Sequence, residues 1–196
     1  MTSILLVRLR EIGDVVFTTP AIRAVREHFP GVHLAYLVEP VAAAVVANNP
    51  HIDEVIVAPR RRGLLGLREE LALVRRLRAQ QFDAVIDFHG GPRASLLTWL
   101  SGSPARIGYE IVGRWWMYTQ RIARPRALRP RHSVENQWDL LAALGIPRPT
   151  PRSFPVEMSN EPEAVAGVGT RLARAGITDD DRLIVMHVSA GNPFRR

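Results

Sequence analysis

The sequence predicts an α/β protein in which a Rossmann-like parallel sheet carries helices on both faces. Short runs that are almost wholly apolar alternate with longer runs whose apolar residues recur every three or four positions. These patterns are typical of buried parallel strands and of amphipathic helices. Glycine-containing turns directly follow two of the apolar runs. A regular alternation of this kind requires one sheet covered by helices on both sides.

The predicted elements follow one another in a regular order along the chain. The opening strand ends in a polar turn, and the helix after it is interrupted at Thr19-Pro20, because proline is favoured at the first position of a helix. Pro30-Gly31 ends this helix, and Gly145 ends the last helix of the series. Strands are expected at 4–7, 32–38, 54–57, 84–88 and 106–109, helices at 20–29, 42–47, 67–77, 93–100 and 132–144, and a loop at 121–131.

Proline content predicts how the chain divides into domains. Residues 147–155 contain four prolines, so the segment 147–158 is expected to be a linker. It would join an N-terminal domain, 1–146, to a second part, 159–196, which has a predicted helix at 161–175 and a strand at 183–187. Because no helix follows to cover this strand, we expect 159–196 to be the start of a truncated second α/β domain.

Composition excludes several classes of protein. Hydrophobic residues make up 46% of the chain and charged residues 23%, as in ordinary globular proteins. There is no cysteine, which excludes disulfides, thiolate zinc sites, iron–sulfur clusters and a cysteine nucleophile. No apolar run reaches the length of a membrane span, and the N-terminus lacks the features of a signal peptide. We therefore expect a cytoplasmic protein.

Positive charge is concentrated in one part of the sequence. All 26 basic residues are arginine, and the segment 60–131 holds fifteen of them against five acidic residues. Such a segment indicates an anionic partner, which could be phosphate groups, nucleic acid or an anionic membrane. Arginine suits phosphate because its planar fork binds two oxygens at once. A non-enzymatic module for anionic polymers stays open as an alternative, although no helix-turn-helix, RNP or zinc pattern of a nucleic-acid-binding protein is present.

The turn that contains Gly13 and Asp14 follows the first predicted strand, at the sheet edge where open α/β folds bind ligands. Glycine allows a ligand to approach the backbone closely. Asp14 has two interpretations: it caps the following helix, or it is a general base presented at the sheet edge. The glycine patterns of dinucleotide-binding folds and of P-loops are both absent.

Other candidate residues follow later strands. His89 and Gly90 lie in a turn after the fourth strand, where His89 either contacts a substrate or closes the turn. Arg60-Arg61-Arg62 follows the third strand and either binds phosphates or forms a solvated face. Arg114-Trp115-Trp116 has the composition of a membrane interface, of a stacking site or of buried packing. Ser189-Ala190-Gly191 is a small-residue loop of the kind that accommodates a diphosphate.

Several of these segments together resemble the lipopolysaccharide heptosyltransferase family, glycosyltransferase family 9. The opening strand Ile4-Leu5-Leu6-Val7 followed by Gly13-Asp14-Val15-Val16 and Thr19-Pro20-Ala21-Ile22 is similar to the start of this family. The same order continues along the chain. The further matching segments are Leu37-Val38-Glu39, Phe82-Asp83-Ala84-Val85-Ile86-Asp87, His132-Ser133-Val134-Glu135 and His187-Val188-Ser189-Ala190-Gly191 with Arg195.

The resemblance implies a GT-B fold of two Rossmann-like domains, of which this chain is the N-terminal half and the start of the C-terminal one. It implies an inverting transfer, without metal or cofactor, of a heptose from a nucleotide diphosphate sugar of the ADP-heptose type to a phosphorylated glycolipid at the inner-membrane surface. A related transferase with a different sugar is the alternative. By this resemblance Asp14 is the catalytic base. We expect acceptor contacts from Gly13, Arg10, Arg60, Arg61, Arg62, His89, Gly90 and Arg114, donor contacts from Ser189, Ala190, Gly191 and Arg195, and no nucleic-acid partner.

Overall fold

The computed structural model describes residues 1–196 except 62, 124–131, 151–152, 160, 179 and 187–196. The chain divides into two compact units, Met1–Ser159 and Asn160–Arg196.

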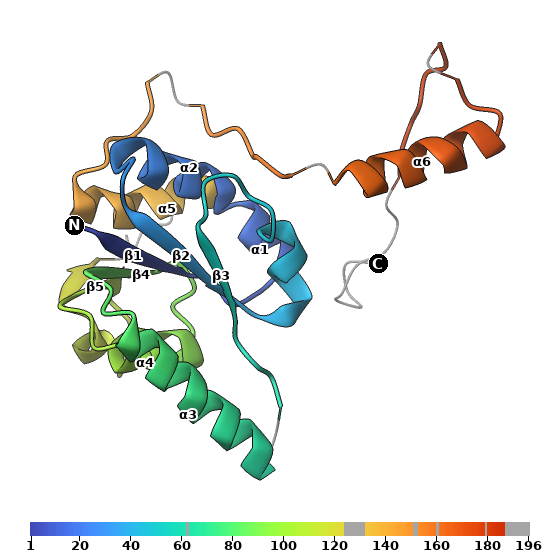
Figure 1. Cartoon of the computed structure of the whole chain (residues 1–196). Helices are drawn as coiled ribbons and strands as arrows, with labels where there is room; N and C mark the ends of the chain where they lie inside the picture. Colours follow the sequence, from blue (N-terminus) through green and yellow to red (C-terminus); the bar gives the residue numbers. More distant parts are fainter. Residues whose placement is uncertain (62, 124–131, 151–152, 160, 179, 187–196) are drawn as a thin grey trace. The chain divides into compact units, whose positions relative to one another are not determined.

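The first unit is built on a six-stranded sheet with the order β3-β2-β1-β4-β5-β6. Every neighbouring pair is parallel, which confirms the fold class predicted from the sequence. Because β1 lies between β2 and β4, the chain runs outward from β1 first in one direction and then in the other (Figure 1). The strands are β1 (Ser3–Val7), β2 (His33–Val38), β3 (Glu54–Val57), β4 (Ala84–Asp87), β5 (Ala105–Tyr109) and β6 (Gln120–Ile122).

Helices cover both faces of this sheet because successive strand side chains point to opposite sides. In β1, Ile4 and Leu6 join one buried cluster, and Leu5 and Val7 join the other. The first cluster is completed by α1 (Ile12–Val16), α2 (Thr19–His28) and α5 (Ser133–Leu141), and the second by α3 (Gly63–Ala79) and α4 (Pro92–Leu100). Short 3₁₀ helices lie at η1 (Pro40–Val45), η2 (Trp115–Met117) and η3 (Ala142–Leu144).

Proline and glycine mark several helix ends, of which Pro20 and Gly145 were predicted from the sequence. Pro20 and Pro92 lie in the first turns of α2 and α4, where the missing N–H leaves no hydrogen bond unmade. Gly145 has a φ of 78° and ends η3 in the left-handed conformation that glycine adopts without strain. The helices α2, α4 and α5 therefore begin and end close to the predicted positions, whereas α3 begins four residues before the predicted 67 and the predicted helix at 42–47 is the 3₁₀ helix η1.

The predicted loop at 121–131 is wrong at its start, where Gln120–Ile122 forms β6 and pairs with β5. β6 lacks the buried apolar side chains that would mark it in the sequence, because it is an edge strand with two exposed residues. Gly108 of β5 allows the Tyr118 ring to lie against the strand, since a Cβ at this position would be 2.3 Å from the ring. The remainder of the predicted loop, 124–131, lies outside the described residues.

The segment predicted as a linker packs along the first unit. Trp138 Nε1 donates a hydrogen bond to the Pro147 carbonyl oxygen at 3.0 Å, and the Trp138 ring contacts Phe154 edge-on. Further on, the backbone N–H of Glu157 donates to Thr19 Oγ1 at 3.0 Å. Apolar and hydrogen-bonding contacts thus continue up to residue 157.

The second unit contains α6 (Pro162–Arg174), which is followed by Gly176 with a φ of 75°. The predicted strand at 183–187 is wrong for its described part, because Leu183–Met186 forms no strand and each of these side chains is more than half exposed. A strand needs a hydrogen-bonding neighbour. The described part of this unit contains none. Across the described residues of both units, no helix has the length and apolar character needed to cross a bilayer.

Candidate active site

The loops that follow β1 and β4 meet at the carboxyl edge of the sheet. The Arg8 Nη1 atom donates to the Phe88 carbonyl oxygen at 2.6 Å, and the His89 ring donates from Nδ1 to the Arg10 carbonyl oxygen at 3.1 Å. This is the point where the strand order reverses, and such switch points form the ligand-binding crevices of open α/β sheets. The sequence prediction that ligand-binding residues gather here is consistent with this geometry.

Asp14 lies inside the first turn of α1, and its carboxylate is 41% exposed. The capping interpretation is wrong, because Glu11 is the residue at the N-cap position and no side chain caps this helix. Instead the Asp14 Oδ2 atom forms an ion pair with Arg8 Nη2. A methyl group built on the neighbouring Gly13 would meet no atom within 4 Å. Asp14 is therefore a carboxylate that is fixed on one side by Arg8 and open on the other.

Arg8 connects the two loops, and sequence reasoning did not single it out. Its side chain is only 15% exposed and contacts both Asp14 and the Phe88 carbonyl. Its Nε atom is buried and has no hydrogen-bond partner among the described residues. The guanidinium therefore orients the Asp14 carboxylate relative to the loop after β4.

Asp87, at the end of β4, holds the loop after β4 through hydrogen bonds to its backbone. It was not identified as a functional residue from the sequence. Its Oδ1 atom accepts hydrogen bonds from the backbone N–H groups of His89 and Gly90, at 2.9 and 2.8 Å. Its Oδ2 atom accepts from the Tyr118 hydroxyl at 2.6 Å. Burial raises the pKa of Asp87, and these hydrogen bonds oppose the shift. The signal that could have found it is a carboxylate that closes an otherwise apolar strand.

The backbone of this loop is closely packed. Gly90 has a φ of 65°, and Gly91 passes so near the His89 ring that a Cβ would be 2.5 Å from it. Arg114 Nη2 donates to the Gly90 carbonyl oxygen at 3.0 Å. Burial, followed by the positive charge of Arg8, lowers the pKa of His89. His89 is thus held as a neutral ring beside the crevice near pH 7.

A cavity of about 700 Å³ adjoins these loops on the side of β2 and β3. It brings together four predicted site residues. Arg10 and His89 come from the loops after β1 and β4, and Arg60 and Arg61 come from the segment after β3. Its walls also contain residues that were not predicted. The lining residues are Leu9, Arg10, Glu39, Pro59, Arg60, Arg61, Glu70, His89, Gly91, Pro92 and Arg93.

Arg93 is the structural centre of this cavity wall. It donates to Glu70 from Nε at 3.0 Å and to Glu39 from Nη1 at 3.0 Å. Arg60 lies 3.4 Å from the second oxygen of Glu39, and Arg61 lies 3.2 Å from Glu69. Arg10 is exposed and has no ion pair among the described residues. Arg10 is therefore the cavity arginine that is most readily available to an anionic ligand.

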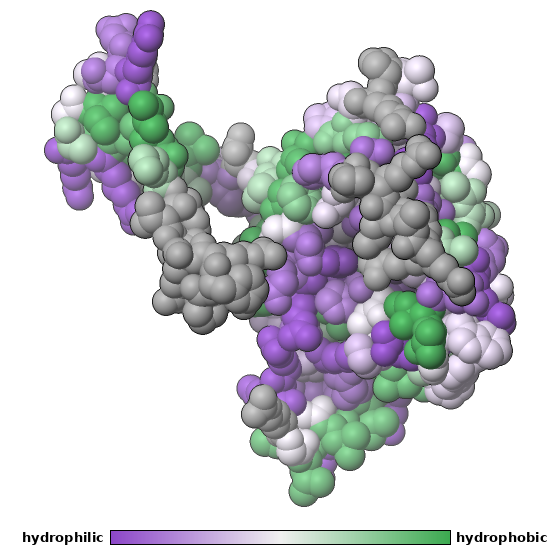
Figure 2. Space-filling view, turned by 180° about the vertical axis from the view of Figure 1, so that it is seen from behind, coloured by the Kyte–Doolittle hydropathy of each residue, from purple (hydrophilic) through white to green (hydrophobic). Residues whose placement is uncertain are grey.

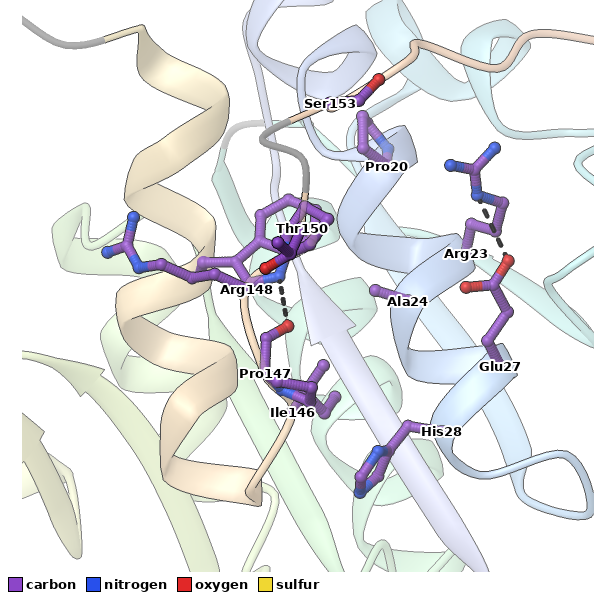
Figure 3. A pocket seen from close by; sticks show the side chains of 12 residues that line it. Pro20, Arg23, Ala24, Glu27, His28, Ile146, Pro147, Arg148, Thr150 and Ser153 are labelled. Atoms are coloured by element: carbon purple, nitrogen blue, oxygen red, sulfur yellow. Dashed lines mark hydrogen bonds and ion pairs between the residues drawn. The ribbon is translucent and has the colours of Figure 1, made fainter.

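A second cavity, of about 550 Å³, lies between α2 and the segment after α5 (Figure 3). Its arginines are engaged by carboxylates, since Arg23 pairs with Glu27 and Glu157 and Arg148 pairs with Asp139. It lies away from the carboxyl edge that carries Asp14. We therefore place the candidate active site at the first cavity.

The described structure brings most of the predicted residues to this one edge. Arg114 contacts the loop after β4 through its hydrogen bond to the Gly90 carbonyl oxygen. Trp115 and Trp116 are 43% and 47% exposed, so they are only partly packed. Among the described residues, no three His, Asp or Glu side chains are grouped as metal ligands would be. Arg62, Ser189, Ala190, Gly191 and Arg195 lie outside the described residues.

Comparison with known proteins agrees with this geometry. The model of glycosyltransferase family 9 (heptosyltransferase) matches residues 70–190. The lipopolysaccharide heptosyltransferase 1 of Pseudomonas aeruginosa is 29% identical over 160 residues, which cover 74% of this chain and 44% of that protein. A putative glycosyltransferase of Haemophilus influenzae is 27% identical over 141 residues, covering 72% of this chain and 40% of that protein. The chain thus spans less than half the length of these relatives.

Solved structures share the fold. A family 9 glycosyl transferase from Veillonella parvula superposes with a TM-score of 0.85 and 25% identity, over 98% of this chain and 54% of that one. The Escherichia coli heptosyltransferase WaaC with ADP-2-deoxy-2-fluoro heptose superposes with a TM-score of 0.65 and 26% identity, over 76% of this chain and 50% of that one. The family model covers well over half of the sequence. The chain belongs to glycosyltransferase family 9, the heptosyltransferase family.

Proposed function

We propose that this chain is the acceptor-side half of an inverting, metal-independent glycosyltransferase. It would transfer a heptose from an ADP-heptose type donor to a phosphorylated glycolipid acceptor at the inner-membrane surface, on the cytoplasmic side. The observation that carries the proposal is the Asp14 carboxylate, which Arg8 holds at the switch point of the sheet, where the loops after β1 and β4 also contribute to an arginine-lined cavity.

The chemistry of inversion fits a single carboxylate base. The acceptor hydroxyl oxygen forms a bond to the anomeric carbon while the bond from that carbon to the nucleotide diphosphate breaks on the opposite face. Asp14 takes the hydroxyl proton, and the diphosphate leaves with the electron pair of the broken bond. The exposed side of Asp14 supports this role, because the acceptor needs direct access to the carboxylate.

The acceptor would occupy the cavity that Arg10 and His89 line, in the same two loops that Arg8 and Asp14 connect. Arg10, Arg60 and Arg61 supply positive charge for its phosphate groups, and His89 supplies a neutral ring for a sugar hydroxyl. Binding of phosphate by Arg60 would compete with its ion pair to Glu39. Gly13, Gly90, Arg62 and Arg114 complete the proposed acceptor set.

The donor would bind on the second domain. We assign the diphosphate to Ser189, Ala190, Gly191 and Arg195, and we retain the division into 1–146, 147–158 and 159–196 as part of the proposal. The structure of WaaC with ADP-2-deoxy-2-fluoro heptose supports a donor of this type. No further cofactor is required by this mechanism.

The test uses the full-length protein and measures ADP release and product mass with ADP-heptose and a phosphorylated acceptor. Asp14→Asn should lower kcat by about 10²–10⁴-fold, because the isosteric amide cannot accept the proton. Glu11→Gln, a neighbouring exposed carboxylate, is the matched control and should leave kcat within about twofold of the wild type. Comparable activity of Asp14→Asn and wild type would refute Asp14 as the base. A product mass that corresponds to a different sugar would refute heptose as the transferred sugar.

A further inference from the structure

Helix α3 has an outward apolar stripe in addition to the face that it buries. Leu73 and Leu77 pack into the core under the sheet. Leu64, Leu67 and Leu71 are 82%, 58% and 48% exposed. Their spacing of three and four residues places them on one side of the helix, which differs from the side of the core leucines. A solvent-facing helix surface ordinarily carries polar residues at such positions.

The same side of α3 carries unpaired positive charge. Arg68 and Arg75 follow Leu64 and Leu71 at intervals of four residues, and both are exposed. Neither has an ion pair among the residues that the structure describes. The acidic residues of the helix belong to its other side, where Glu69 pairs with Arg61 and Glu70 pairs with Arg93. The outward stripe is therefore leucine and arginine only.

The proposed acceptor site adjoins the acidic side of α3, which lies away from the stripe. Arg60 and Arg61 line the cavity immediately before α3 begins, and Glu70 of α3 lines it as well. Figure 2 shows hydrophobic surface gathered at the projecting end of the molecule where the first turns of α3 lie. The acceptor cavity and the stripe thus lie on different sides of the same helix.

We propose that the outward stripe of α3, formed by Leu64, Leu67, Arg68, Leu71 and Arg75, docks onto an anionic lipid bilayer. This inference rests on the proposed function, because it names the surface by which the lipid-linked acceptor is approached. Leucine side chains enter the headgroup region, and arginines on the same face pair with lipid phosphates. Contact with an apolar protein surface would bury the leucines. It would leave Arg68 and Arg75 without an anionic partner.

The experiment measures binding of the full-length protein to sedimented vesicles, with phosphatidylglycerol-containing and purely phosphatidylcholine vesicles compared at equal salt. The wild type should bind the anionic vesicles more tightly. The double change Leu64→Ser with Leu67→Ser should weaken that binding at least about tenfold. Val112→Ser, at a side chain that is 96% exposed in the loop after β5, is the apolar control and should have no effect.

A neighbouring pair of arginines gives a matched charge control. Arg75→Gln should weaken binding to anionic vesicles by about fivefold, which corresponds to one arginine near a charged bilayer. Arg76→Gln changes the same charge one residue away, but Arg76 is paired with Glu54 and should have a much smaller effect. Equal effects of the two changes would overturn the stripe as the docking surface.

Two further results separate this inference from the proposed function. The stripe variants should keep wild-type turnover of a short, lipid-free acceptor, whereas Asp14→Asn should lose turnover and keep vesicle binding. An active Asp14→Asn with vesicle binding intact refutes only the proposed base. Failure of the wild type to bind anionic vesicles, with Leu64 protected from surface labelling in the full-length protein, refutes the membrane surface and assigns the stripe to a protein contact.

Discussion

Arg8 and Asp14 form an ion pair across the loop that joins β1 to α1, and the same guanidinium reaches the backbone of the loop after β4. One side chain thereby ties the proposed base to both loops that border the cavity. We therefore regard Arg8 as a positioning residue. Its buried Nε finds no hydrogen-bond partner in the part of the chain that the structure describes, and its two terminal nitrogens make the contacts.

Replacement of Arg8 should reduce turnover more than acceptor binding. Arg8→Ala removes the partner that orients Asp14, and a misplacement of about 1 Å costs on the order of 10²-fold in rate. We expect kcat to fall by about 10–100-fold with a smaller change in KM, and Arg8→Lys to recover part of the loss because it restores the charge. Steady-state kinetics of the full-length protein check this. An unchanged kcat in Arg8→Ala, or a Lys variant no better than Ala, would contradict the positioning role.

Tyr118→Phe should destabilise the first unit. The variant removes the hydroxyl that donates to the buried Asp87 carboxylate at 2.6 Å, and leaves that oxygen with Ser95 at 3.5 Å. An unsatisfied buried acceptor costs about 1–3 kcal/mol or more. Urea unfolding should report a loss of that size. Tyr109→Phe, whose hydroxyl donates to the Asn136 carbonyl oxygen, is the control and should cost less, about 0.5–1.5 kcal/mol.

Stability should fall on mild acidification because of His89. Burial holds its pKa in the folded protein below the ordinary value of 6.5. Above pH 6.5 the ring is neutral in both states, and as the pH falls below that value the unfolded state binds the proton first. The free energy of unfolding therefore decreases from pH 6.5 down to the folded-state pKa and then levels off. Urea titrations between pH 7 and 5 should be flatter for His89→Gln. An identical slope in that variant would assign the pH dependence to other groups.

The 196 residues alone should not transfer sugar. The chain spans about half of the solved family structures that it matches, and the proposed mechanism needs a complete donor domain. We expect ADP release and product to be undetectable with this polypeptide and present with the full-length protein. Mass spectrometry of the acceptor decides the result. Product formation by the 196-residue chain would show that a donor site is complete within it.

The sequence predicted the central strands well because a buried parallel strand is a nearly continuous apolar run. Edge strand β6 lacks that signal, since Gln120 and Arg121 are exposed. Leu183–Met186 carries the apolar signal and yet forms no strand, because a strand requires a partner as well as a composition. Local composition therefore predicts a strand correctly only where a partner strand is present to pair with it.

The site was predictable in part for a similar reason. Asp14 and His89 were found because glycine turns follow two apolar strands, and the sheet topology brings those turns together. The contacts of Arg8 and of Asp87 depend on residues about 80 and 31 positions away in the sequence, which no local pattern reveals. The cavity wall depends likewise on Arg93 reaching Glu39 across the sheet edge.

The position of β1 at the centre of the sheet also bears on synthesis of the protein. The β2 partner of β1 is complete at Val38, but the partner for its other edge, β4, is complete only at Asp87. At about 5–20 residues per second, translation of the intervening segment takes roughly 3–10 s. During this interval the most apolar strand of the molecule has an open edge, and open edges recruit other chains. Nascent chains that stall between these two strands should therefore depend on ribosome-associated chaperones more than chains that have passed Asp87.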